Sequence, residues 1–189
     1  MITLRHYSSA IRLSHVRLPN WHCAARHPGK PAGALLDWLQ NEDSLTRRLI
    51  AAGNDDFRVE LLQQSLQPAR ADEAASLGLD TGSQVWVRED LLHTAGAPRV
   101  FARSVAPMQT LAQAGSDLSD LGTRSLGELL FSGGLGVSRG PIEISRYPAE
   151  WLPAAWRNDN CWARRSRFGD DRLQLLVCEV FLEGWPPAS

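Results

Sequence analysis

Residues Cys161 to Leu182 read CWARRSRFGDDRLQLLVCEVFL, a pattern that predicts two β-strands joined by a turn at GDD. The second half, from Leu173 to Leu182, is apolar on both faces, which is typical of a central strand in a sheet. Glu179 lies in the middle of this apolar run. A lone carboxylate in such a strand is costly unless a partner neutralises it or it faces a polar cavity. Glu179 is therefore the first candidate for a functional residue.

The rest of the chain predicts short helices between further hairpins. Helices are expected at Ala34–Gln40, Asp43–Gly53 and Ser125–Phe131. Strands are expected at Phe57–Leu62, in Gly82–Pro107 as a hairpin around the turn TAGAP, and at Gly140–Tyr147. The segment Tyr147–Asn160 is expected to form a short surface helix. Sequential hairpins with helices between them predict a single α+β domain with an antiparallel sheet.

Composition places the chain among ordinary globular proteins. At 189 residues it has the length of one domain, and its 22% charged and 43% apolar residues are typical of that class. The net charge of -1 gives no general attraction to nucleic acid or to anionic membranes. No apolar run approaches the roughly 18 residues of a membrane span. The three cysteines are odd in number and lack metal-ligand spacing, so we expect a reduced, cytoplasmic setting without disulfides.

The N-terminal region is basic and free of acidic residues. Residues 1–36 contain no Asp or Glu but carry four histidines and five cationic side chains. This pattern resembles an organelle transit peptide, and it lacks the apolar core of a secretory signal. The other interpretations are a loosely ordered basic lead-in, or a start codon assigned upstream of the true one. We expect residues 1–14 to be poorly ordered or dispensable, and residues 15–189 to form the single domain.

Several predicted strands carry arginines. Arg88 shares a strand face with Trp86, while Arg165 and Arg167 share one face of their strand and Arg164 lies on the other. One interpretation, favoured for Arg103, Arg146 and Arg164, is that the arginines form internal ion pairs, for example between Arg88 and Glu179, or lie at solvated edge positions. The other is a cavity that binds an anion, because the planar guanidinium group matches a carboxylate in bidentate geometry. Such a cavity would take an anionic ligand with an apolar or aromatic body, and Glu179 would meet its hydrogen-bond donor.

Other functional motifs are absent from the sequence. FSGGLG has neither the spacing nor the lysine of a phosphate-binding loop, and no pair of histidines has metal-ligand spacing on a predicted helix. Ser44 is interpreted as a helix cap, because no His or Asp context makes it a nucleophile. No basic stripe with interleaved aromatic residues indicates a nucleic-acid surface. We therefore expect no metal, no cofactor and no nucleic-acid partner.

Six motifs, in order and at similar spacing, resemble the chorismate lyase family, the chorismate pyruvate-lyases of ubiquinone synthesis. They are LLDWL…EDSLTRRL, WVREDLL, ARSVAP, SLGELLF, IEISR and WARRSRF…LLVCEVFLEG. The resemblance runs from Arg12 to the C-terminus; the N-terminal extension and the long connection Tyr147–Asn160 lie outside it. It implies a single α+β domain whose antiparallel sheet is covered by short helical flaps over a buried ligand site.

The resemblance also implies the site residues. Arg88, in W-x-R-E, would hold the ring carboxylate of the substrate, and Glu179 would meet the ring hydroxyl. Main-chain groups of Leu45 and Leu126, in the two flaps, would complete the site. Leu45 replaces a methionine that is frequent in the family, a change that a backbone contact tolerates.

The implied reaction is the loss of pyruvate from chorismate to give 4-hydroxybenzoate. Because the ring becomes aromatic, no metal or redox cofactor is required, and the protein must anchor the ring and exclude water. Arg165 or Arg167 is a candidate for the enolpyruvyl carboxylate. Glu179 is either a general base or only a polarising group, and an intramolecular hydrogen transfer stays open. We expect a monomer without membrane insertion that retains, and is inhibited by, its product.

A second function class is a binding protein without chemistry. The effector-binding domains of some helix-turn-helix transcription regulators resemble the same fold and bind small ligands. A regulator needs a DNA-binding module, and the proline-containing N-terminal 30 residues do not encode one. A free-standing protein that binds an aromatic carboxylate is the alternative.

Overall fold

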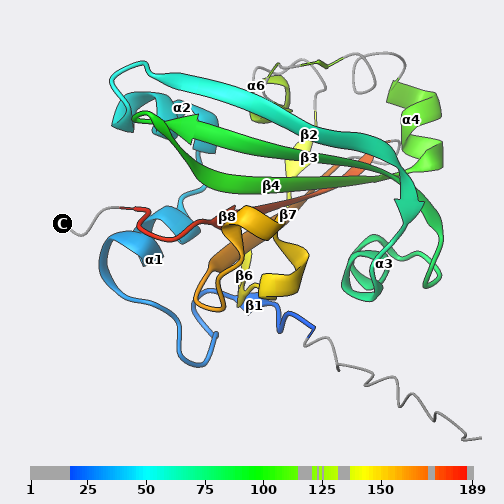
Figure 1. Cartoon of the computed structure of the whole chain (residues 1–189). Helices are drawn as coiled ribbons and strands as arrows, with labels where there is room; N and C mark the ends of the chain where they lie inside the picture. The colour runs from blue at the N-terminus through cyan, green and yellow to red at the C-terminus, as the bar shows by residue number, and fades with distance from the viewer. Residues whose placement is uncertain are drawn as a thin grey trace, which may run out of the picture.

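The computed structural model describes residues 18–114, 121–122, 124, 126–131, 137–169 and 173–186. These residues form one domain built on an eight-stranded antiparallel sheet (Figure 1). The strands are β1 (His22–Cys23), β2 (Phe57–Pro68), β3 (Gln84–Thr94), β4 (Ala97–Pro107), β5 (Ser138–Arg139), β6 (Glu143–Arg146), β7 (Trp162–Gly169) and β8 (Gln174–Phe181). Their order is β1-β6-β7-β8-β4-β3-β2, and β5 pairs with β7. The predicted α+β class is confirmed.

The hairpin predicted from Cys161 to Leu182 is formed by β7 and β8. Arg164 lies opposite Glu179 in its register. β8 also pairs with β4, so it is a central strand, as its apolar sequence predicted. Of the predicted turn at GDD, residues 169–171, Gly169 is the last residue of β7, and residues 170 and 171 lie outside the described part of the chain.

The second hairpin, β3–β4, is closed by a two-residue turn. Ala95 and Gly96 connect the strands, and both have positive φ, 50° and 73°. Two such residues are required by a type I′ turn, whose twist matches that of the flanking strands. On the outer side of β3, β2 continues to Pro68 instead of ending at Leu62, because the register shifts between Leu61 and Gln63 and pairing resumes beyond it.

Short helices cover the sheet. They are α1 (Gly33–Gln40), α2 (Leu45–Ala52), α3 (Ala71–Leu77), α4 (Met108–Ala114) and α6 (Leu126–Phe131). Ser44 caps α2 as predicted, accepting a hydrogen bond from the backbone N–H of Arg47 at 3.4 Å. The helix predicted in Tyr147–Asn160 is instead two short 3₁₀ turns, Ala149–Trp151 and Ala154–Trp156. Pro148 and Pro153 precede these turns, and Pro153 prevents the first from continuing as a helix.

The two faces of the sheet have separate cores. On the first, here called the site face, α1, α2 and α6 pack over β3, β4, β7 and β8 through residues such as Trp38, Leu49 and Leu130. On the second, the α3 face, the cover is α3 together with residues 147–152. Figure 1 shows α2 and α6 on one side of the long strands and α3 on the other. Alternation along each strand therefore decides which core a side chain joins.

Three further expectations concern the N-terminal residues, the cysteines and membrane spans. Residues 1–14, predicted to be dispensable, lie outside it. Cys23, Cys161 and Cys178 are all free thiols. In the described ranges, no helix is long and apolar enough to cross a bilayer.

Candidate functional site

The register of the central strands sets two rows of side chains on the site face. Asp90, Ala102 and Glu179 lie side by side on β3, β4 and β8. The row one pleat away runs through Arg88, Ser104, Val177 and Ser166. Neighbouring strands lie about 4.8 Å apart, so the α carbons of Asp90 and Glu179 are about 10 Å apart. Small residues of β4 therefore separate charged residues of β3 from a charged residue of β8.

A narrow cavity of about 30 Å³ lies between these rows and the covering helices. Its wall includes Asp90 and Glu179 from the sheet, Thr46 from α2, Leu126 from α6 and Phe168 from β7. This volume is well below the roughly 150 Å³ of an apolar cavity that holds a benzene ring. Binding of a ring therefore requires side chains of the wall, or α2 and α6, to move outward.

Arg88 is fully buried, with 0% of its side chain exposed. Its Nε–H donates to Oδ2 of Asp90 at 2.7 Å, a short charge-assisted hydrogen bond. Its terminal nitrogens make longer contacts, at 3.4 Å each, to the side-chain oxygen of Gln64 and the backbone oxygen of Arg124. Arg88 thus pairs with Asp90, and the alternative of an Arg88–Glu179 ion pair is wrong.

Glu179 pairs with Arg164 from the adjacent strand. Arg164 Nε donates to Oε2 of Glu179 at 2.6 Å. Its Nη1 donates to the backbone oxygens of Trp38 and Asn41 at the end of α1, at 3.1 and 2.6 Å. The side chain of Glu179 is 16% exposed, and this pairing holds it in the cavity wall. The interpretation of Arg164 as an internal ion-pair partner is confirmed.

Asp90 is the residue of this site that the sequence reasoning missed. Its side chain is 5% exposed, and its Oδ1 is buried without a hydrogen-bond partner among the described residues. Burial raises the pKa of Asp90, although the hydrogen bond and charge of Arg88 act against this rise. The signal was present in WVRED, since residues two apart on a strand share a face and Arg88 had been placed inward.

The two predicted main-chain contacts fall at helix N-termini. Leu45 is the first residue of α2, and Leu126 is the first residue of α6. Leu126 lines the cavity directly, whereas α2 contributes Thr46, the neighbour of Leu45. Backbone N–H groups in a first helical turn have no partner within the helix and can bind an anion.

Arg165 and Arg167 lie on the α3 face, away from the cavity. Arg165 Nε donates to Glu143 at 2.8 Å, and its Nη1 lies 3.4 Å from Asp72. Arg167 is exposed and donates to the backbone oxygen of Ser76. Because side chains alternate along β7, Arg164 and these two arginines cannot serve the same cavity. Neither is therefore kept as a candidate for the enolpyruvyl carboxylate.

The α3 face holds a second set of buried charges. Arg103 donates to both oxygens of Glu73, at 2.6 and 3.1 Å, and to Glu89 at 2.7 Å. Burial alone would raise the pKa of Glu73, but hydrogen bonds and charge from Arg103 and Arg70 lower it overall. Arg70 also donates to the hydroxyl of Tyr147 at 2.7 Å. These groups satisfy one another and form a closed network.

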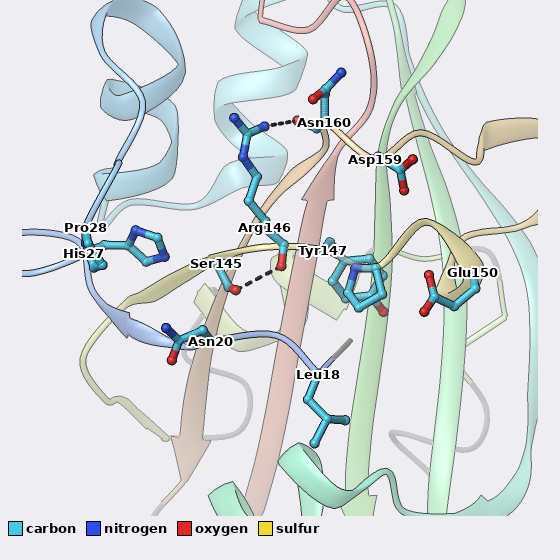
Figure 2. A pocket seen from close by; sticks show the side chains of 11 residues that line it. Leu18, Asn20, His27, Pro28, Ser145, Arg146, Tyr147, Glu150, Asp159 and Asn160 are labelled. Atoms are coloured by element: carbon cyan, nitrogen blue, oxygen red, sulfur yellow. Dashed lines mark hydrogen bonds between the residues drawn. The ribbon is translucent and has the colours of Figure 1, made fainter. Parts of the chain in front are cut away.

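A larger hollow lies elsewhere on the described surface, as an open groove of about 820 Å³ (Figure 2). Figure 2 shows its wall, to which the N-terminal segment contributes Asn20 and His27, and residues 145–160 contribute Arg146 and Glu150 among others. None of the site residues proposed from the sequence lines it. Size alone does not make it the site, because it lacks convergent buried charge.

Comparison with known proteins identifies the family. The family model described as chorismate lyase matches residues 21–187. The chain belongs to the chorismate lyase family. A relative from Pseudomonas aeruginosa, named a probable chorismate pyruvate-lyase, is 54% identical over 149 residues, which are 79% of this chain and 83% of that protein. Another of the same name, from Pseudomonas fluorescens, is 47% identical over 164 residues, 87% of each chain.

Solved structures of other proteins share the fold. The C-terminal domain of PhnF matches with a TM-score of 0.51 and 19% identity, covering 66% of this chain and 82% of that one. The C-terminal domain of the histidine utilization repressor of Pseudomonas syringae matches with a TM-score of 0.52 and 12% identity, covering 70% and 96%. At such identities the likeness extends to the fold alone.

Proposed function

We propose that this protein eliminates pyruvate from chorismate to give 4-hydroxybenzoate, the first committed step toward ubiquinone. Membership of the chorismate lyase family supports the reaction class. The observation that carries the proposal is the arrangement of the site face, where Arg88 and Glu179 stand across the small residues Ala102 and Ser104 of β4. This arrangement suits an aromatic ring with a carboxylate at one end and a hydroxyl at the other.

In the proposed complex, Arg88 binds the ring carboxylate through its terminal nitrogens. Its contacts to Gln64 and Arg124 are long, so a carboxylate can replace them with stronger bonds. The first N–H groups of α2 and α6, at Leu45 and Leu126, add main-chain donors. The ring would then extend over Ala102 and Ser104 toward Glu179.

The chemistry takes place at the Glu179 end. The ether bond at C3 breaks, its electron pair leaves with the enolpyruvyl group, and the hydrogen at C4 is removed, which makes the ring aromatic. The released enolpyruvate takes a proton on its methylene carbon and becomes pyruvate. Glu179 either removes the C4 proton or hydrogen-bonds the C4 hydroxyl while another route moves the hydrogen. Arg164 holds the Glu179 carboxylate at this position in both cases.

The covering helices have a predicted consequence for turnover. Since α2 and α6 contribute to the wall of a cavity too small for a ring, substrate access and product departure require these helices, or side chains of the wall, to move. A product that keeps the ring carboxylate and hydroxyl satisfies both ends of the site. We therefore propose slow product release and inhibition by 4-hydroxybenzoate.

The test is the release of pyruvate from chorismate by the purified protein. We expect turnover in the wild type and large losses in Arg88→Ala and Glu179→Gln. Arg167→Ala is the matched control, because this arginine is exposed on the α3 face and should leave turnover unchanged. If the wild type binds 4-hydroxybenzoate but releases no pyruvate, the protein is a binding module without chemistry, and the proposed reaction is wrong.

A further inference from the structure

Asp90 has an incomplete set of hydrogen bonds at the position where the proposed ligand carboxylate would bind. Its Oδ2 accepts from Arg88 Nε, whereas its Oδ1 has no partner among the described residues. The side chain is 5% exposed and lines the cavity. Buried carboxylate oxygens normally have partners, so an orphaned one that lines a cavity points to a group that binds there.

Because Asp90 binds the Nε–H of Arg88, the two terminal nitrogens are the part of the guanidinium group that a ligand can bind. Nε is held at 2.7 Å, while Nη1 and Nη2 make only contacts of 3.4 Å. A ligand carboxylate would therefore bind the two terminal nitrogens end-on. Arg88 would then lie between two carboxylates, its own partner Asp90 and the ligand.

No other cation described on the site face is free to neutralise the charge of the ligand carboxylate, because each already has partners of its own. Arg164 donates to Glu179 and to backbone oxygens of α1 and the following residue. Arg139 of β5 interacts electrostatically with both Arg164 and Glu179. It donates hydrogen bonds to Ser166 and to the backbone oxygens of residues 41 and 42. Arg124 is exposed, and Glu60 of β2 pairs with His93. Among the described residues, Arg88 is thus the single cation that hydrogen-bonds Asp90.

Two anions on one buried guanidinium group favour protonation of one of them. Burial already raises the pKa of Asp90 in the free protein, against the effect of Arg88. A second carboxylate nearby raises it further, because like charges disfavour the ionised form. The aromatic carboxylate is shared by substrate and product, so both would act on Asp90 in the same way.

This inference rests on the proposed function, because it takes the ligand to be an aromatic carboxylate on Arg88. We propose that Asp90 is an affinity-determining residue, which takes up one proton from solvent when that carboxylate binds and donates its new Oδ1–H to the ligand. Release of the ligand returns the proton to solvent. Rising pH then weakens binding, which promotes the departure of an enclosed product.

Titration calorimetry with benzoate tests this inference, since benzoate carries the carboxylate without a phenol that titrates. Measured in two buffers of different ionisation enthalpy, wild-type binding should show net proton uptake. Between the pKa of Asp90 in the free protein and its higher value in the complex, affinity should fall by up to about tenfold per pH unit.

Asp90→Asn separates this role from a purely structural one. Asn can accept from Arg88 Nε and donate from its amide, so it imitates the protonated aspartic acid. We expect benzoate to bind Asp90→Asn more tightly than wild type at neutral pH, without proton uptake from this position and with a flat pH profile. Glu60→Gln, which removes a carboxylate of the neighbouring strand β2 that binds His93, should keep the wild-type profile.

Three outcomes would overturn the inference: pH-independent wild-type affinity, an unchanged pH slope in Asp90→Asn, or weaker binding in Asp90→Asn, as expected if Asp90 only positions Arg88. Pyruvate release, measured on the same preparations, distinguishes this failure from failure of the proposed function. Turnover of chorismate with any of these three results rejects the role of Asp90 alone. Absence of both turnover and benzoate binding rejects both.

Discussion

The two faces of the sheet each bury an arginine beside carboxylates, but they satisfy those groups to different degrees. On the α3 face, Arg103 binds Glu73 and Glu89 with three hydrogen bonds, and the pKa of Glu73 is lowered. On the site face, Arg88 makes one short bond to Asp90, whose pKa is raised and whose Oδ1 has no hydrogen-bond partner in the part of the chain that the structure describes. The same residue types therefore make a self-sufficient network on one face and a site that a ligand completes on the other.

The largest expected difference is in stability after loss of each arginine. Arg103→Met would leave Glu73 and Glu89 buried without this partner, which should cost about 3–5 kcal/mol of unfolding free energy. Arg88→Met should cost about 1–2 kcal/mol, because Asp90 can become neutral by taking a proton. Denaturant unfolding without ligand measures both. Equal losses would show that the two faces do not differ in the way described.

The next effect is that of Glu179→Gln on the rate of the chemical step, compared with its effect on ligand affinity. Glu179→Gln keeps a hydrogen-bond acceptor for the ring hydroxyl and removes the group that can take a proton. If Glu179 is the base, the single-turnover rate should fall by about 100-fold or more, while affinity for 4-hydroxybenzoate changes by less than about tenfold. A fall in affinity with an unchanged rate would instead assign Glu179 to binding.

A smaller effect is the pH dependence of stability, which has opposite signs on the two faces. The folded-state pKa of Glu73 lies below its ordinary value of 4.5, so its contribution is present above that value and is lost as pH falls through the lower one. The folded-state pKa of Asp90 lies above its ordinary value of 3.8, so stability falls as pH rises from there through the raised value. Each unit of pKa shift corresponds to about 1.4 kcal/mol.

Unfolding free energies of Glu73→Gln and Asp90→Asn, measured from roughly pH 2 to 7, check these signs. Glu73→Gln should remove part of the acid-side loss of stability. Asp90→Asn should remove part of the decrease toward neutral pH. If both substitutions change the pH slope in the same direction, the contrast between the two faces is contradicted.

Much of the fold could be predicted from the sequence because its strands carry clear patterns. The apolar run around Glu179 and the TAGAP turn each indicated their hairpin, and Ser44 indicated the start of α2. Prediction failed where a pattern was hidden: the second half of β2 is polar and resumes only after a register shift, and β1 and β5 are two residues long. Local patterns do not encode such tertiary pairing.

The candidate site was only partly predictable, for a different reason. Sequence periodicity separated Arg164 from Arg165 and Arg167 correctly, but it could not tell which face the helices α2 and α6 would cover. It also could not assign partners, so Arg88 was considered with Glu179, whereas the register gives Arg88 to Asp90. Partner choice depends on which strands are neighbours, and that is a property of the whole sheet.

The central claim is that a ligand completes the site face and leaves the α3 face untouched, and its most direct test is ligand-induced stabilisation. At about a hundredfold excess over its dissociation constant, 4-hydroxybenzoate should stabilise the wild type by about 2.7 kcal/mol, and benzoate, at the same concentration, by less. The stabilisation should vanish in Arg88→Met and persist in Arg103→Met. Equal stabilisation of the two variants, or equal effects of the two ligands on the wild type, would contradict the account.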